Sequence, residues 1–125
     1  MKLMQLDKEQ GFGNIIRSFS AGQLHVNNTV FTDHVIVSTD AIIEHWAPAD
    51  IMELSIADFA EAISASPEII VFGTGTMQVF PSGALITDIL RKGIGFEVMD
   101  TGAACRTYNV LAAERRNVVA ALLVR

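Results

Sequence analysis

The first candidates for chemistry in this 125-residue chain are two glycines that bracket a threonine. Gly73-Thr74-Gly75 directly follows the apolar run Ile69–Phe72, and glycines at the end of a strand let backbone N–H groups approach an anion closely. A dinucleotide fingerprint would need a third glycine where Gln78 stands, and a P-loop would need a Gly-Lys-Ser/Thr run that the sequence lacks. The segment is a candidate anion site, and the alternative is a tight turn that ends a central strand.

A second candidate follows the next apolar run, Gly95–Met99. Asp100 and Thr101 stand where a helix is expected to begin, and either side chain can cap that helix by accepting from its free N–H groups. Capping alone explains both residues. In open α/β sheets, however, ligands bind outside the carboxyl ends of neighbouring parallel strands. We therefore expect these two residues to lie beside the glycine loop and to form a crevice with it.

Cys105 is the only cysteine, and it falls in the first turn of the same predicted helix. The helix dipole and Arg106 could lower the pKa of its thiol and give a reactive thiolate. A nucleophile also needs a base, and the three histidines all lie in the first third of the chain: His25, His34 and His45. The alternative is that Cys105 is a small packing residue, because free cysteine is among the most buried residue types.

Arg106 and Asn109 are three residues apart and share one helical face, so that Arg106 could hold an anion. Its alternative role is that of a surface or carboxylate-paired arginine. The candidate ligand-binding set is Gly73, Thr74, Gly75, Asp100, Thr101, Cys105, Arg106 and Asn109. We predict no catalytic residue and no cofactor. We also predict no metal site, because no cysteine or carboxylate cluster surrounds the histidines.

The elements that must position these residues differ between the two parts of the chain. Turn signals separate short apolar runs from about residue 12 to 46, which predicts a β-meander with a hairpin turn at Asn27-Asn28. The expected strands are Ile15–Phe19, Gln23–Val26, Thr29–Phe31 and Val35–Val37.

From about residue 55 to 124 the apolar pattern alternates between helix and strand. Helices are expected from Ser55 to Pro67, with Asp58 completing a capping box, after Ser82 with Leu85, Ile86, Ile89 and Leu90 on one side, and over about 103–114. The intervening strands are 69–72, 95–99 and 117–124. This order predicts an α/β fold in one domain over 1–125, with 69–72 and 95–99 as neighbouring central parallel strands.

Composition narrows the classes of function. The net charge of −5 gives no broad attraction for phosphate backbones, which argues against nucleic acid. Met1–Gln10 resembles neither a signal peptide nor a transit peptide, and no apolar run is long enough to span a membrane. With a lone cysteine, these features predict a cytoplasmic protein. Half the residues are hydrophobic and only 18% are charged, which predicts a protein partner or a homodimer.

The C-terminal half resembles a known family. The strand with its Gly-x-Gly end, the Met99-Asp100-Thr101 turn and the run Ala104-Cys105-Arg106-Thr107-Tyr108-Asn109 together are similar to mitochondrial complex I assembly factor 3 and its uncharacterised bacterial and archaeal relatives. This resemblance implies a three-layer (β+α)/β/α fold with a mixed, largely parallel central sheet and an N-terminal β layer. It also implies a role in protein association, because the family has no established catalytic activity.

Two functions remain open at this point. The first is a non-catalytic interaction protein, similar to an assembly factor. The second is a small-molecule or anion binder, or a weak enzyme, that uses the crevice at the ends of the central strands.

Overall fold

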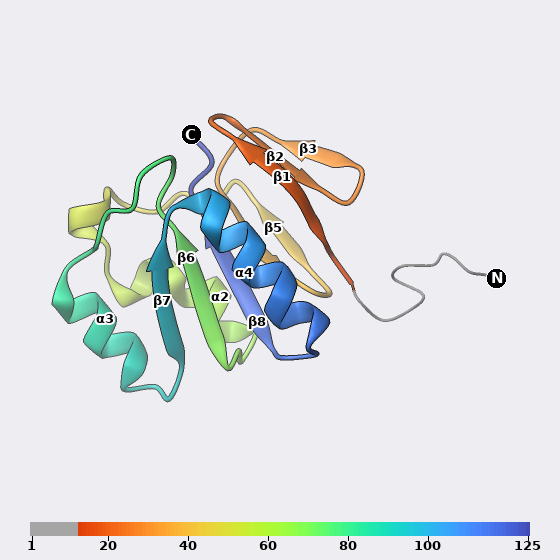
Figure 1. The fold of residues 1–125 in the computed structure, drawn as a ribbon. Coiled ribbons are helices and arrows are strands. Elements are labelled where there is room, and N and C mark those ends of the chain that lie inside the picture. The colour runs from red at the N-terminus through yellow and green to blue at the C-terminus, as the bar shows by residue number, and fades with distance from the viewer. Residues whose placement is uncertain (1–12) are drawn as a thin grey trace.

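Two β-sheets and a set of short helices make up the computed structural model, which describes residues 13–125 (Figure 1). The sequence interpretation of Met1–Gln10 and the start of the β-rich part at residue 12 lie outside the described residues.

The smaller sheet is the predicted meander, with strands in the order β1-β2-β3 and antiparallel pairing throughout. Its strands are β1 (Ile16–Ser20), β2 (Gln23–Val26) and β3 (Thr29–Phe31). Asn27 in the second turn has a φ of 53°, a left-handed conformation that asparagine tolerates better than most residues. The predicted Asn27-Asn28 hairpin turn is thereby confirmed.

The central sheet has five strands in the order β5-β4-β8-β6-β7. They are β4 (Val35–Ser38), β5 (Ile42–Glu44), β6 (Ile69–Gly73), β7 (Gly95–Met99) and β8 (Val118–Leu122). The strand pairs β8/β6 and β6/β7 are parallel, whereas β4 is antiparallel to both β5 and β8. The sheet is therefore mixed. The fourth predicted meander strand belongs to this sheet, and the sequence reading missed β5.

The prediction of neighbouring parallel strands at 69–72 and 95–99 is confirmed, but the central position of the second strand is wrong. β7 lies at the edge of the sheet. Glu97 in its middle is exposed, whereas all five residues of β8 are buried. β8 is covered on both faces, since Ala120 packs in the core on one side of the sheet and Ala121 in the core on the other.

The helices follow the predicted pattern with one local difference. The helix expected after Ser55 begins as a 3-10 turn, η2 (Ile56–Phe59), and continues as a short α2 (Ala60–Ser64). The Asp58 carboxylate accepts a hydrogen bond from the Ser55 N–H, as expected. The remaining helical segments are η1 (Ile51–Glu53), α3 (Gly83–Leu90) and α4 (Thr101–Ala113). Leu90 was predicted on the same side of α3 as Leu85 and Ile89, but it is 51% exposed, since it lies about 140° around the helix from Leu85.

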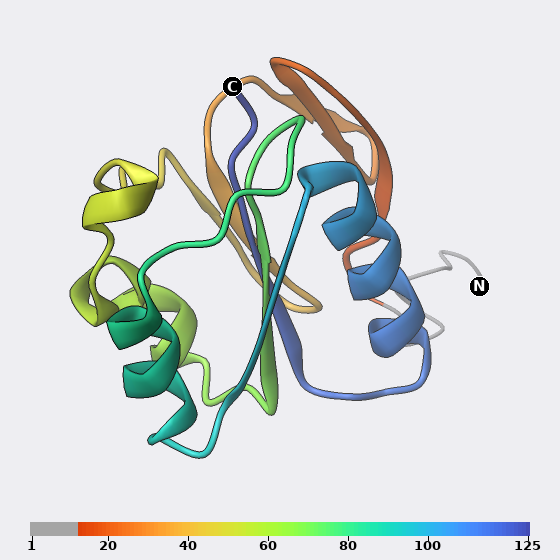
Figure 2. The same cartoon turned by 60° about the vertical axis from the view of Figure 1, so that its left-hand side comes forward.

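The core lies on both faces of the central sheet. Figure 2 shows the sheet nearly edge-on, with α4 and the small sheet on one side and α2 and α3 on the other. The first side packs alternate strand residues such as Val71 and Leu122 against Tyr108 of α4. The second packs Phe72 against Trp46 and Phe59 in edge-to-face contacts. This arrangement confirms the predicted (β+α)/β/α fold class.

Candidate functional site

The carboxyl ends of β6 and β7 meet at the start of α4, and hydrogen bonds of Thr101 join that helix to the loop after β6 and to the end of β8. The Gly75 N–H donates to Thr101 Oγ1 at 2.8 Å, and the Thr101 N–H donates to the Gly75 carbonyl at 2.8 Å. The Thr101 hydroxyl in turn donates to the Leu123 carbonyl at 2.7 Å. The sequence correctly predicted that these loops lie together. Their polar groups, however, bind each other rather than face an open crevice.

Close packing accompanies these bonds. A Cβ atom added at Gly73 would lie 2.8 Å from Thr101 Oγ1, 2.9 Å from Thr101 Cα and 3.0 Å from Leu122 Cδ2. Such distances are well inside van der Waals contact, so the glycine lets the strand end approach the first turn of α4. We call this closed contact among Gly73, Gly75, Thr101 and Leu123 the strand-end junction.

Thr74 organises the loop that follows β6. Its hydroxyl donates to the Met77 carbonyl and accepts a hydrogen bond from the Val79 N–H at 3.1 Å. Gln78 Nε2 ties the same loop to the edge strand by donating to the Val98 carbonyl at 2.9 Å. These contacts hold the segment 77–80, which we call the apolar loop.

The side chains of the apolar loop face outward. Met77 is 72% exposed, Phe80 58% and Val79 39%, although all three are hydrophobic. The sequence reasoning missed this feature because it treated Gln78 only as the residue that breaks a nucleotide motif. A signal was present, since Met77, Val79 and Phe80 fall within four consecutive residues before the α3 cap.

Asp100 acts as the expected helix cap. Its Oδ1 accepts a hydrogen bond from the Ala103 N–H at 2.9 Å. A carboxylate at this position stabilises the positive end of the helix dipole, and it repels any other anion at the same place.

The other predicted site residues line a groove between α4 and β1, with a volume of about 260 Å³. Arg106 is exposed there. Asn109 binds the backbone of Ile16 on both sides, because its Oδ1 accepts from the N–H at 3.0 Å and its Nδ2 donates to the carbonyl at 2.7 Å. The complete lining is Ile16, Arg17, Ser18, Phe19, Gly102, Cys105, Arg106 and Asn109.

Cys105 is buried at the bottom of this helix face, at 5% exposure. Burial raises the pKa of its thiol to about 12, and the neighbouring Arg106 guanidinium offsets only part of that rise. The thiol is therefore protonated at neutral pH, which favours the packing role. His34 is engaged elsewhere: its Nδ1 accepts a hydrogen bond from the Val124 N–H at 2.9 Å, and burial lowers its pKa.

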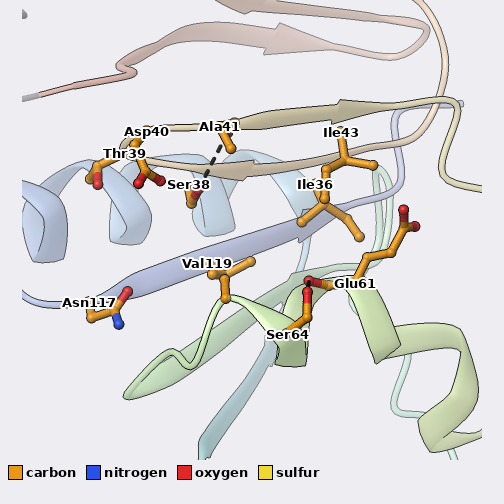
Figure 3. Close-up of a pocket in the computed structure, with 11 residues that line it drawn as sticks. Ile36, Ser38, Thr39, Asp40, Ala41, Ile43, Glu61, Ser64, Asn117 and Val119 are labelled. Carbon is orange, nitrogen blue, oxygen red and sulfur yellow. Dashed lines mark hydrogen bonds between the residues drawn. The ribbon is translucent and has the colours of Figure 1, made fainter.

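A cavity of about 390 Å³ lies away from all of these residues, between α2 and the β4–β5 end of the central sheet (Figure 3). Its floor is apolar and its rim is polar. The sequence reasoning missed it because its residues come from several distant segments and form no motif. They are Ile36, Ser38, Thr39, Asp40, Ala41, Ile43, Glu61, Ser64, Ala65, Asn117 and Val119.

Two kinds of site are absent from residues 13–125. No group of three or more histidine, cysteine, aspartate or glutamate residues in that range could hold a metal ion. Within the same range, no helix is both long enough and apolar enough to cross a bilayer.

Solved structures share this architecture. A crystal structure of a protein from Bordetella parapertussis has a TM-score of 0.79 at 34% sequence identity, covering 90% of this chain and 96% of that one. A solution structure from Bordetella pertussis, described as a Mth938-like domain, has a TM-score of 0.78 at 26% identity and covers 99% and 92%. The class is thus a three-layer α/β protein with a Mth938-like fold.

Residues 16–123 match the family described as "Protein of unknown function (DUF498/DUF598)", and the chain belongs to this family. NADH dehydrogenase [ubiquinone] 1 alpha subcomplex assembly factor 3 from Danio rerio is 31% identical over 121 residues, which are 94% of this chain and 68% of that protein. The "13 kDa major membrane protein" of Francisella tularensis subsp. holarctica is 29% identical over 103 residues, 82% of this chain and 84% of that one. The resemblance drawn from the sequence is confirmed.

Proposed function

We propose that this protein works by binding another protein, in the manner of an assembly factor, and that the apolar loop is its contact surface. The observation that carries the proposal is the exposure of Met77, Val79 and Phe80 on a loop that hydrogen bonds hold in place. Large apolar side chains gathered on one exposed segment are typical of interaction sites.

The energetics favour such a role. Each apolar Å² removed from water contributes roughly 25 cal/mol, so covering three large side chains gives a useful driving force. A loop already fixed by Thr74 and Gln78 loses little conformational entropy when a partner binds it. The loop therefore suits recognition of a preformed surface.

The relatives also support a role in protein binding. Two proteins named as complex I assembly factor 3 are 31% and 27% identical to this chain over 94% and 95% of its length, which is 68% and 66% of their own length. The buried, protonated Cys105 and the self-bonded strand-end junction do not form a nucleophile–base pair. That the partner is a second copy of the chain and that the protein is cytoplasmic both remain predictions.

Site-specific photo-cross-linking tests the proposal. We expect Phe80→p-benzoylphenylalanine, expressed in cells that make the protein naturally, to give a discrete adduct when irradiated. The matched control is Val110→p-benzoylphenylalanine, because Val110 is similarly exposed at 57% but stands alone on α4. An adduct of twice the monomer mass would identify the partner as a second copy.

The cross-link must also depend on the loop. Met77→Ser together with Val79→Ser in the cross-linking variant should remove the adduct. The melting temperature should fall only slightly, since Met77 is 72% and Val79 39% exposed. Equal adducts from positions 80 and 110, or none from either, would contradict the proposal.

A second candidate function is anion binding in the groove between α4 and β1. It is favoured by the presence of Arg106 in a concave site of about 260 Å³, although the Asp100 carboxylate caps the start of the same helix. Of the predicted ligand contacts in this groove, Arg106 and nearby backbone groups are available to an anion. Asn109 is not, because its side chain hydrogen-bonds to the backbone of Ile16.

Thermal shift measurements test this candidate. Sulfate should raise the melting temperature of the native protein more than that of Arg106→Ala, because only the native protein would bind the ion. Arg91→Ala on α3 is the matched control, since Arg91 is also exposed but does not line the groove. Equal shifts in all three proteins would indicate general salt exclusion and would remove the candidate.

A further inference from the structure

We propose that the cavity between α2 and the β4–β5 end of the sheet binds an alkylammonium or alkylguanidinium group. Its volume of about 390 Å³ lies in the range of small-molecule sites. Figure 3 shows Ile36 and Val119 along the sheet, Glu61 and Ser64 on the α2 side, and Asp40 on the β4–β5 turn. The site is distinct from the apolar loop and the α4 groove.

The hydrogen bonds within the cavity lining favour a ligand that donates hydrogen bonds. The Ser38 hydroxyl donates to Asp40 Oδ1 at 3.1 Å, and the Ser64 hydroxyl donates to the Glu61 carbonyl at 2.8 Å. Asn117 turns its amide nitrogen to the Ser66 carbonyl, to which it donates at 2.8 Å. These contacts engage the hydroxyl protons of Ser38 and Ser64 and one amide N–H of Asn117. The Thr39 hydroxyl can still donate. The lining offers mainly acceptors to a ligand: the two carboxylates, the Asn117 amide oxygen and the hydroxyl lone pairs.

The negative charge of the cavity lining favours a cationic ligand. Asp40 and Glu61 are the two ionisable residues among the lining residues, and both are acidic. Neither has a salt-bridge partner among residues 13–125. An anionic ligand would be repelled, whereas an ammonium or guanidinium group gains both charge attraction and hydrogen bonds to carboxylate.

The apolar floor of the cavity favours a ligand with an alkyl stem. Ile36 and Val119 lie almost completely buried at the base of the cavity, and the half-buried Ile43 beside them offers the accessible apolar surface. An alkyl stem can lie on this apolar surface while its charged end reaches the rim, as lysine and arginine side chains do on protein surfaces. The same chemistry occurs in a free diamine and in a lysine or arginine side chain of a partner protein.

An NMR titration of the complete protein tests the proposal. The probes are 1,5-diaminopentane, its neutral analogue 1,5-pentanediol, and N-acetyl-lysine methylamide. We expect the two amines to shift the amide signals of residues 38–41 and 61–65, and the diol to leave them unchanged. Tighter binding of 1,5-diaminopentane would indicate a free diamine as the ligand. Tighter binding of N-acetyl-lysine methylamide would indicate a side chain of a partner protein.

Two isosteric variants test the contacts. Glu61→Gln and Asp40→Asn should each weaken amine binding about two- to fivefold, the range expected for one exposed charge pair. Glu97→Gln is the matched control, because Glu97 is an exposed carboxylate on β7, at the opposite edge of the sheet from β5. Equal shifts with the diol, no shifts with either amine, or an equal loss in the Glu97 control would overturn the proposal.

Discussion

Thr101→Val is expected to lower the free energy of unfolding by about 2 to 4 kcal/mol, because it removes one hydroxyl that serves two backbone groups. The Gly75 N–H donates to that hydroxyl, and the hydroxyl donates to the Leu123 carbonyl. Thr101 is completely buried, so water does not easily replace either bond. Valine has nearly the same shape, which limits the change to the lost hydrogen bonds. Urea denaturation measures the difference.

Two controls accompany that variant. Thr101→Ser keeps the hydroxyl and should recover most of the stability. Thr107→Val, on the same helix, removes a hydroxyl whose recorded contact is the weak Met99 Sδ acceptor, and it should cost much less. If Thr101→Val were as stable as Thr107→Val, the strand-end junction would not hold the loops together.

Gly73→Ala is expected to destabilise the protein by about 1 to 3 kcal/mol, the usual cost of overpacking a tight site. The added methyl group would meet Thr101 Cα, a backbone atom that cannot move without shifting α4. A glycine that merely kept a ligand crevice open would tolerate alanine in the free protein. The variant therefore separates packing from ligand access as the reason for this residue.

Gly83→Ala is the matched control for that change. Gly83 is the first residue of α3, and nothing lies within 4 Å of a Cβ atom placed there. Alanine should stabilise the protein slightly, by up to about 1 kcal/mol, because it restricts the unfolded chain. Equal behaviour of the two alanine variants would contradict the close packing at Gly73.

The fold could be predicted to a large extent because its signals are local. Apolar runs, the Asn27-Asn28 turn and the caps at Ser82 and Asp100 each act within a few residues, and all of them place elements correctly. The order of strands is a long-range property. β8 lies at the centre and β7 at the edge, an order that depends on how all five strands pair and that no single segment reveals.

The candidate site was less predictable for the same reason. Sequence placed Gly75 and Thr101 side by side, but it does not show whether their polar groups face a ligand or, as the structure has them, bind each other. Thr74 was expected at a ligand, and its hydroxyl instead organises the loop after β6. The α2 cavity joins residues as far apart as Ile36 and Val119, so only the assembled sheet defines it.

Amide hydrogen exchange of the isolated protein tests most directly whether a closed junction presents a fixed apolar loop. The Gly75 N–H binds Thr101 Oγ1 and the Val79 N–H binds Thr74 Oγ1, whereas the Met77 N–H has no partner within residues 13–125. We expect slow exchange at Gly75 and Val79 and fast exchange at Met77. Exchange at Gly75 and Val79 as fast as at Met77 would contradict the account, because it would mean that the junction opens and the loop has no fixed form.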